Sequence, residues 1–234
     1  MTDILKTLRA VIWPERCIFC GSPVFSSDKN TCERCKNSLP FINGKVCAAC
    51  GSEKQFCGCR SSIMYYDRFT APFYYENEVR HSIHNFKFHG RKKNAAFYAS
   101  YMADCVKEKY DGEKFDFITA VPMYSSDRKS RGYNQSDELA SSLSKKLGIE
   151  FRSVIRKIYH TDKQSGKQMT DRTGNVFGVF DVEENLEGKS ILLVDDIRTT
   201  GSTLSECGKM LYLAGAKRVC CVSIAAAKFK KKNK

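Results

Sequence analysis

Apolar residues in this chain form short continuous runs that alternate with helical repeats over its last three quarters. A continuous apolar run predicts a strand buried on both faces, as in a parallel sheet. We expect strands at residues 69–75, 115–121, 151–158, 176–181, 191–194 and 219–226. Apolar residues three or four positions apart predict helices at residues 76–88, 94–110, from a cap at Ser136 to Gly148, and from 204 to Gly215. This alternation predicts an α/β fold with a mostly parallel sheet flanked by helices.

The segment from Ile191 to Thr203 joins a buried strand to two acids, a polar loop and a helix. Backbone N–H groups and hydroxyls at a helix N-terminus favour a phosphate. Carboxylates beside that phosphate would repel it, so we expect them to bind neutral hydroxyls or a divalent cation. A sugar phosphate meets both demands. The residues concerned are Asp195, Asp196, Arg198, Thr199, Thr200, Gly201, Ser202 and Thr203.

A Walker-B-like strand of a nucleotide triphosphatase is the alternative interpretation of the same segment. That interpretation requires a partner loop of the form G-x-x-x-x-G-K-[ST]. The sequence contains none, because Gly208-Lys209 is followed by Met210. The sugar-phosphate interpretation is therefore favoured.

Eight of the twelve cysteines form close pairs near the N-terminus, namely Cys17 and Cys20, Cys32 and Cys35, Cys47 and Cys50, and Cys57 and Cys59. Such pairs present two thiolates to one tetrahedral zinc ion, so the set predicts two structural Zn²⁺ sites. In the preferred arrangement the first two pairs bind one ion and the last two pairs bind the other. A cross-braced arrangement remains open. A secreted disulfide scaffold is less favoured because no signal peptide is evident. We expect residues 1–62 to hold an N-terminal helix and both zinc sites, and residues 63–234 to form the main domain.

A formal net charge of +13 favours polyanionic partners. Lys87, Arg91, Lys92 and Lys93 gather around Gly90 among aromatic residues, and residues 228–234 form a basic tail. Both groups are consistent either with solvated chain ends or with contacts to nucleic-acid phosphates. The apolar N-terminal residues are interrupted by Lys6 and Arg9, so we expect no membrane span and a cytoplasmic protein.

Residues 195–203 resemble the phosphoribosyl-pyrophosphate (PRPP) motif of type I phosphoribosyltransferases. In that family the two acids hold the ribose 2′- and 3′-hydroxyls and the loop holds the 5′-phosphate, while Arg198 stands where an aliphatic residue is usual. Together with the cysteine pairs, the whole chain resembles the ComF (ComFC) family of competence proteins. The supporting segments are residues 85–90, 121–122, 131–135 and 172–177.

The resemblance implies a double zinc ribbon before a type I phosphoribosyltransferase-like domain that binds PRPP with Mg²⁺. It implies a pyrophosphate loop containing Arg128, Arg131, Gly132, Asn134 and Gln135, and a flexible lid containing Lys163 and Arg172. The implied role is handling of incoming single-stranded DNA in natural transformation, beside a competence helicase.

Two other functions remain open at this stage. The chain could be an active PRPP-dependent transferase, whose acceptor the sequence does not identify. It could instead be a PRPP-sensing regulator, but a regulator would normally carry an effector domain, and none is recognisable.

Overall fold

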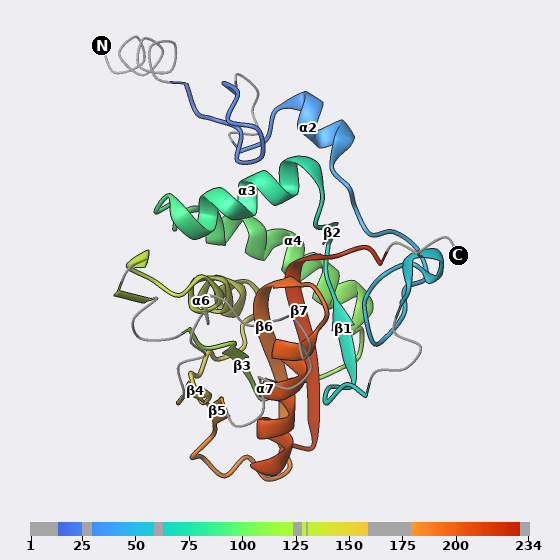
Figure 1. Ribbon diagram of the computed structural model, residues 1–234, viewed down its shortest axis with the longest axis vertical. Helices are drawn as coiled ribbons and strands as arrows, with labels where there is room; N and C mark the ends of the chain where they lie inside the picture. The colour runs from blue at the N-terminus through green and yellow to red at the C-terminus, as the bar shows by residue number, and fades with distance from the viewer. Residues whose placement is uncertain are drawn as a thin grey trace, which may run out of the picture.

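A parallel β-sheet forms the centre of the molecule (Figure 1). The structure is a computed structural model that describes residues 14–24, 30–58, 63–123, 128–129, 131–158 and 179–229. The strands lie in the order β1 (Arg68–Thr70), β7 (Arg218–Ala226), β6 (Ser190–Arg198) and β3 (Phe117–Ala120). A short β2 (Phe73–Tyr74) also pairs with β7, and every pairing in this sheet is parallel. The expected α/β fold is confirmed.

Helices cover both faces of the sheet. α4 (Asn94–Lys109) and α6 (Gln135–Leu147) pack on one face, and α7 (Ser202–Leu213) packs on the other. α3 (Asn77–Phe88) packs on α4 on the side away from the sheet (Figure 1). Alternate residues of β6 enter the two cores: Leu192 packs toward α4 and α6, whereas Leu193 packs toward α7. Both side chains are fully buried, which explains the unbroken apolar run in the sequence.

The predicted strand at residues 69–75 is interrupted at Ala71-Pro72, since proline has no N–H to offer a ladder. The predicted strand at 151–158 is wrong over most of its length. Phe151 makes one isolated bridge to Ile118, and only β4 (Arg156–Lys157) is a strand. β4 pairs antiparallel with β5 (Phe180–Asp181), outside the main sheet. Ion pairs from Arg152 to Glu184 and from Arg156 to Glu183 link these two segments.

Two predicted boundaries need correction. The cap of α6 is Asn134 and not Ser136: the Asn134 side chain accepts a hydrogen bond from the Ser136 N–H, at 3.1 Å. β6 continues to Arg198, so the two acids lie inside the strand and not beyond its end. Gly148 ends α6 in the left-handed conformation, with φ 69°, as the sequence predicts.

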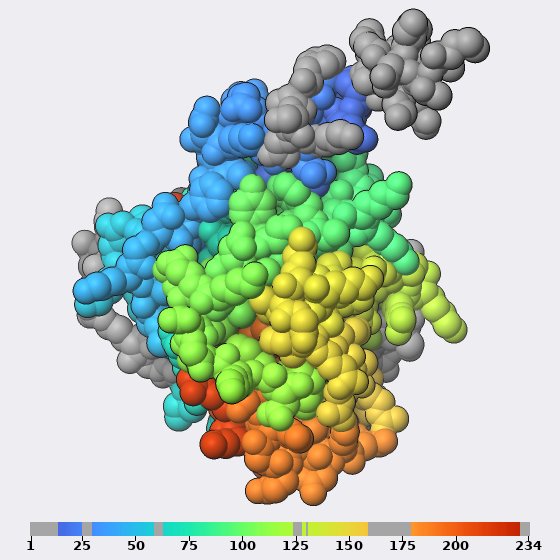
Figure 2. Space-filling model, turned by 180° about the vertical axis from the view of Figure 1, so that it is seen from behind, coloured from blue at the N-terminus to red at the C-terminus, as the bar shows by residue number. Residues whose placement is uncertain are grey.

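The N-terminal region contacts both cores. Its first part, with α2 (Glu33–Ser38), buries Phe19 completely in edge contacts with Phe73, Phe97 and Tyr98. Its second part, with the short helix η1 (Lys54–Phe56), joins the core on the α7 side. From behind, the blue first part rests on the green region of α3 and α4 (Figure 2).

Several predicted features lie outside the described residues, namely the N-terminal helix, Cys59, the lid with Lys163 and Arg172, and residues 230–234. Within the described part of the chain, no helix combines the length and the apolar character needed to cross a membrane.

Candidate functional site

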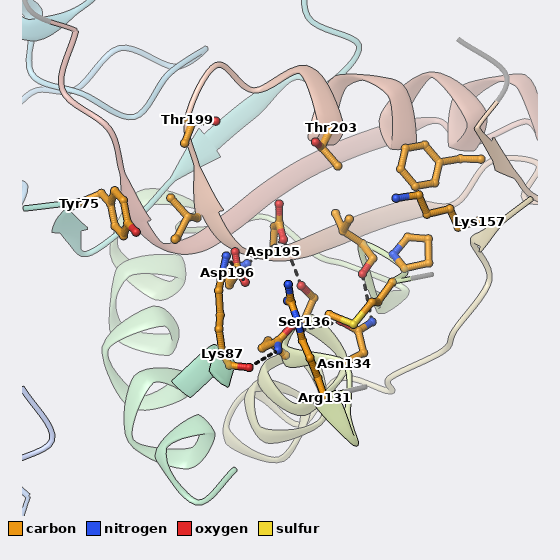
Figure 3. A pocket seen from close by; sticks show the side chains of 16 residues that line it. Tyr75, Lys87, Arg131, Asn134, Ser136, Lys157, Asp195, Asp196, Thr199 and Thr203 are labelled. Carbon is orange, nitrogen blue, oxygen red and sulfur yellow. Dashed lines mark hydrogen bonds and ion pairs between the residues drawn. The ribbon is translucent and has the colours of Figure 1, made fainter. Parts of the chain in front are cut away.

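A cleft of about 440 Å³ opens at the carboxyl end of β6, where ligands bind in parallel α/β sheets (Figure 3). The strands bring together residues that lie far apart in the sequence. The lining residues are Tyr75, Lys87, Val121, Pro122, Met123, Arg131, Asn134, Gln135, Ser136, Lys157, Phe180, Asp195, Asp196, Ile197, Thr199 and Thr203.

The two acids of β6 occupy different environments in this cleft. Asp195 Oδ1 accepts hydrogen bonds from Ser136 Oγ at 3.0 Å and from the Asp196 N–H at 2.8 Å. Asp196 Oδ2 forms an ion pair with Lys87 Nζ, at 2.9 Å. Lys87 reaches this position from the end of α3 (Figure 3). The lysine therefore belongs to the cleft, although the sequence grouped it with a surface cluster.

Burial of the Asp195 carboxyl, followed by repulsion from Asp196, raises the pKa of Asp195 to about 7. The hydrogen bonds from Asp196 N–H and Ser136, together with the positive charge of Lys87, act in the opposite direction. Asp195 consequently titrates near neutral pH. In its charged form it can accept hydrogen bonds from ligand hydroxyls.

The loop after β6 is shaped by Gly201, whose φ of 88° begins α7. A Cβ at Gly201 would lie 3.0 Å from two nitrogens of Arg198, so this close approach and the positive φ both disfavour a side chain there. The Ser202 N–H donates to Thr200 Oγ1 at 3.3 Å. Thr199 and Thr203 face the cleft (Figure 3), where the first turn of α7 provides N–H groups suited to an anion.

Arg198 lies behind this loop and not among the residues that line the cleft. Its side chain is 1% exposed. Nε donates to the Tyr66 hydroxyl at 3.1 Å, and the two terminal nitrogens donate to the carbonyls of Thr199 and Thr200 at 3.5 and 3.4 Å. The guanidinium also stacks over Phe69, 5.3 Å from the ring centroid.

Of the predicted pyrophosphate loop, Arg131, Asn134 and Gln135 line the cleft. Gly132 turns the chain with φ 80°. Arg128 instead lines an adjoining cavity of about 340 Å³. Gln135 Nε2 donates to the Lys87 carbonyl at 3.2 Å, which ties α6 to the end of α3.

Several cleft residues were not predicted as ligand contacts, among them four with polar or aromatic side chains: Tyr75, Ser136, Lys157 and Phe180. Ser136 carried a sequence signal, but as a helix cap. Its hydroxyl faces Asp195 only because α6 packs beside β6. The other three come from short strands or strand ends whose pairing partners are remote in sequence, so no local pattern could reveal them.

The remaining cations predicted to bind DNA lie at the exposed turn between α3 and α4. Lys92 Nζ approaches Glu138 at 3.6 Å and lies 5.0 Å from the Tyr133 ring centroid, whereas Arg91 and Lys93 are exposed. Beside them the Phe88 ring is 54% exposed.

The Phe88 ring contacts a cation and a second ring. The Arg131 guanidinium is 4.7 Å from its centroid, and the His84 ring is 4.8 Å away. An exposed aromatic ring beside cations is the arrangement that single-stranded nucleic acids use for stacking.

The basic tail does not begin as a solvated segment. Lys228 Nζ pairs with Glu76 Oε2 at 2.6 Å and lies 4.4 Å from the Tyr74 ring centroid. The tail is therefore docked where it leaves β7.

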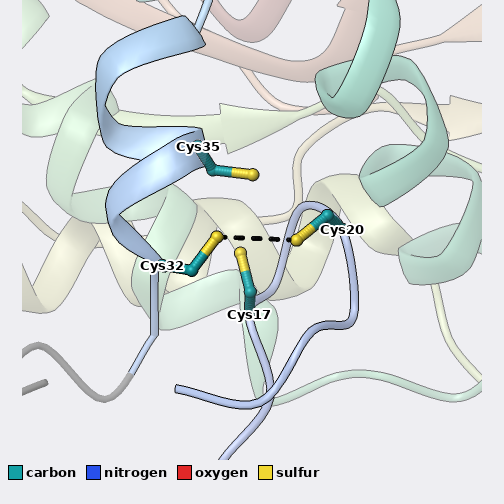
Figure 4. Close-up of side chains that lie close together, drawn as sticks. All are labelled: Cys17, Cys20, Cys32 and Cys35. Atoms are coloured by element: carbon teal, nitrogen blue, oxygen red, sulfur yellow. Dashed lines mark hydrogen bonds between the residues drawn. The ribbon is translucent and has the colours of Figure 1, made fainter. Parts of the chain in front are cut away.

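Among the described residues, two groups of cysteines converge. The sulfur atoms of Cys17, Cys20, Cys32 and Cys35 all lie within 4.8 Å of one another and point to a common centre (Figure 4). This spacing and this donor set fit a tetrahedral zinc ion with Zn–S bonds of about 2.3 Å. Cys47, Cys50 and Cys57 form the second group by the same criterion. Successive pairing is confirmed for these seven cysteines.

Comparisons with known proteins agree with this architecture. Residues 8–63 match the double zinc ribbon domain, and residues 133–234 match the phosphoribosyl transferase domain. Competence protein F of Haemophilus influenzae is 28% identical over 216 residues, covering 87% of this chain and 93% of that protein. Competence protein ComFC of Bacillus subtilis is 26% identical over 199 residues, covering 80% of each. DNA utilization protein YhgH of Salmonella typhimurium is 28% identical over 215 residues, covering 88% and 94%.

Proposed function

The chain belongs to the ComF family, which joins a double zinc ribbon to a phosphoribosyltransferase domain, and from this we propose that it is an accessory protein of natural transformation. In this proposal the cleft binds PRPP and the surface around Phe88 handles single-stranded DNA. The protein acts in the cytoplasm, where a competence helicase is the proposed partner.

The observation that carries the PRPP proposal is the pair of acids in β6 facing the loop that begins α7. Asp195 and Asp196 would accept hydrogen bonds from the ribose hydroxyls. The N–H groups of residues 199–203 would hold the 5′-phosphate, since the helix N-terminus favours negative charge. Mg²⁺ arriving with PRPP would neutralise part of the pyrophosphate charge.

Lys87 and Arg131, together with Lys157, are cationic side chains that line the cleft. In the ligand-free protein Lys87 is paired with Asp196 Oδ2, and in the proposed complex Lys87 would leave this carboxylate. The pyrophosphate would then receive Lys87. Exchange of one ionic partner for another keeps the cost of opening the pair small.

The DNA proposal is supported by Phe88 with its flanking Arg131 and His84, and by the exposed Arg91 and Lys93 beside it. Bases would stack on Phe88 while phosphates neutralise the cations, which requires no particular sequence. Because Arg131 serves both surfaces, DNA and PRPP would influence each other's binding.

Calorimetry of PRPP with Mg²⁺, run beside a titration with single-stranded DNA, tests the proposal. We expect PRPP to bind wild-type protein, and Asp195→Asn with Asp196→Asn to abolish that binding without loss of zinc or DNA affinity. Equal PRPP affinity in the double variant would contradict the assignment of the acids. Absence of DNA binding at low ionic strength would contradict the DNA role.

A second candidate function is a PRPP-dependent transferase. It is favoured by the adjoining cavity, which shares Pro122, Met123, Asn134 and Lys157 with the cleft and could hold an acceptor. Displacement at the ribose anomeric carbon needs positioning and charge stabilisation, and no protein nucleophile. Release of pyrophosphate from PRPP only in the presence of an acceptor, such as an oligonucleotide or a nucleobase, would support this function.

A further inference from the structure

The second cysteine group is hydrogen-bonded to the main domain through its own knuckle, Cys47-Ala48-Ala49-Cys50. The Ala48 carbonyl accepts from the Phe69 N–H at 2.7 Å, at the start of the sheet. The Ala49 carbonyl accepts from the Tyr66 hydroxyl at 2.8 Å. The carbonyls of both alanines between the two cysteines are therefore hydrogen-bonded to β1 or to the residues just before it.

Tyr66 connects this knuckle to the loop that faces the cleft. Its hydroxyl donates to Ala49 and accepts from Arg198 Nε at 3.1 Å. Burial raises the pKa of Tyr66 to about 12, so the hydroxyl keeps the proton that it donates. Arg198 in turn donates to the carbonyls of Thr199 and Thr200. A continuous chain of hydrogen bonds thus runs from the knuckle to the loop.

The packing around Arg198 leaves it no route to a ligand. The guanidinium lies 5.3 Å from the centroid of the Phe69 ring and 5.9 Å from the centroid of the Phe229 ring. Phe229 in turn contacts Gly58, where a Cβ would lie only 2.7 Å from the ring. Each of the three guanidinium nitrogens donates one hydrogen bond, Nε to Tyr66 and the two terminal nitrogens to the loop carbonyls.

We propose that Tyr66 and Arg198 are positioning residues through which the second zinc knuckle holds the loop at residues 199–203 in its phosphate-binding conformation. Zinc fixes the geometry of the knuckle, and so the direction of the Ala49 carbonyl. A buried guanidinium must satisfy its donors, which makes the loop carbonyls its obligatory partners. This role explains why an arginine stands at a position where related motifs carry an aliphatic residue: its guanidinium connects Tyr66 to the loop. This inference rests on the proposed function, because the binding measurement that tests it uses PRPP.

Tyr66→Phe is the decisive variant, because it removes one hydroxyl and keeps the ring. Tyr74→Phe is its matched control: Tyr74 is also buried, and its hydroxyl accepts from the Glu53 N–H of the same ribbon, at 3.1 Å. We expect Tyr66→Phe to weaken PRPP binding about tenfold and to speed amide hydrogen exchange in residues 199–205 about tenfold. Tyr74→Phe should change neither, and both variants should keep their zinc.

A double-variant cycle separates a relay from independent packing effects. If Tyr66 acts through Arg198, Tyr66→Phe combined with Arg198→Met should weaken PRPP binding no more than Arg198→Met alone. Cys57→Ser, which removes a ligand of the second zinc ion, should reproduce the faster exchange of the loop. If that variant does not fold, the comparison of Tyr66→Phe with Tyr74→Phe still tests the proposal.

The proposal would be overturned if amide hydrogen exchange in residues 199–205 of Tyr66→Phe proceeded at the wild-type rate. It would also be overturned if the losses of PRPP affinity in the two single variants added up in the double variant. Failure of wild-type protein to bind PRPP would instead refute the proposed ligand, and the exchange comparison between Tyr66→Phe and Tyr74→Phe would still test the link.

Discussion

The two zinc ribbons are attached to opposite sides of the sheet, and the second adds directed hydrogen bonds to its apolar packing. The first ribbon inserts Phe19 among aromatic rings beside α3 and α4. The second is joined to the side that carries α7 by directed hydrogen bonds from Phe69, Tyr66 and Glu53. Apolar burial is nondirectional, whereas hydrogen bonds fix angles and distances. The first attachment is thus suited to stability, and the second to transmitting geometry.

The proposed DNA surface and the proposed phosphate loop also lie on opposite sides of the sheet. α3, which carries Lys87 and Phe88, belongs to the side of the first ribbon. The loop at residues 199–203 belongs to the side of the second. Asp195 and Asp196 link the two sides: they are bonded to α6 and α3 on the side of the first ribbon, and they share the cleft with Thr199 and Thr203 of the loop that leads into α7.

The largest effect is expected from the first zinc site. Cys35 is fully buried among its three partner cysteines, so Cys35→Ser should cost one of two zinc ions and most soluble expression, a destabilisation on the order of 5 kcal/mol or more. Elemental analysis and thermal unfolding measure both. Cys105→Ser, at a buried cysteine outside the two groups, should keep both ions. A Cys35→Ser protein that retains two zinc ions would refute the assignment of this ligand.

Phe19→Ala tests whether the first ribbon contributes stability alone. Removing a fully buried phenylalanine should lower the free energy of unfolding by about 3–5 kcal/mol. Amide exchange in residues 199–205 of the folded variant should stay at the wild-type rate, because the ring contacts α4 and β2 and not the loop. Faster amide exchange in these residues would show that the first ribbon also controls the conformation of the loop. The two ribbons would then not differ in this role.

Asp195→Asn tests the junction through pH. The folded protein binds a proton at Asp195 more tightly than the unfolded chain, because the pKa is raised to about 7. The stability that this proton provides is complete at low pH and is lost as pH rises from about 4 to about 7.

Asparagine keeps the carbonyl oxygen that accepts from Ser136 and carries no charge. Asp195→Asn should therefore gain stability over wild type across this pH range, to about 4 kcal/mol above pH 7. Denaturant unfolding at a series of pH values measures the difference. A difference independent of pH would show that Asp195 keeps an ordinary pKa.

Phe88→Ala tests the surface on the first side. Loss of one stacking platform should weaken single-stranded DNA binding by about 1–3 kcal/mol, with the salt dependence unchanged. Leu213→Ala, at an apolar residue of α7 that is 71% exposed, should leave DNA affinity at the wild-type value. Fluorescence anisotropy at several salt concentrations measures both. Equal affinity for the two variants would remove Phe88 from the DNA surface.

The smallest effect concerns the cations at the turn between α3 and α4. If Arg91 and Lys93 each contact one phosphate, changing both to glutamine should reduce the slope of log affinity against log salt by about 1.4. Lys114 and Lys217 are exposed at the opposite, amino end of the strands. Changing these two to glutamine should leave the slope unaltered. If both double variants reduced the slope equally, DNA would have no preferred path over the surface.

The sequence alone determined the features that depend on near neighbours in the chain. Paired cysteines predicted their own clusters, because a knuckle of a few residues already presents two thiolates to one ion. The apolar runs of β6 and β7 predicted buried strands, since only a strand covered on both faces needs every side chain apolar. The acidic pair and the loop after it were also visible, because both come from one continuous segment.

Tertiary structure decided whatever depends on partners remote in the sequence. Lys87 resembles any other cation at the end of a helix until α3 is placed beside Asp196. Arg198 resembles a ligand-binding residue until Tyr66 and Phe69 enclose it, 132 and 129 positions earlier in the chain. The strand predicted at 151–158 failed for the same reason. Strand pairing and the direction of a long polar side chain are set by whichever distant groups satisfy their hydrogen bonds and charge, and that choice exists only in the folded chain.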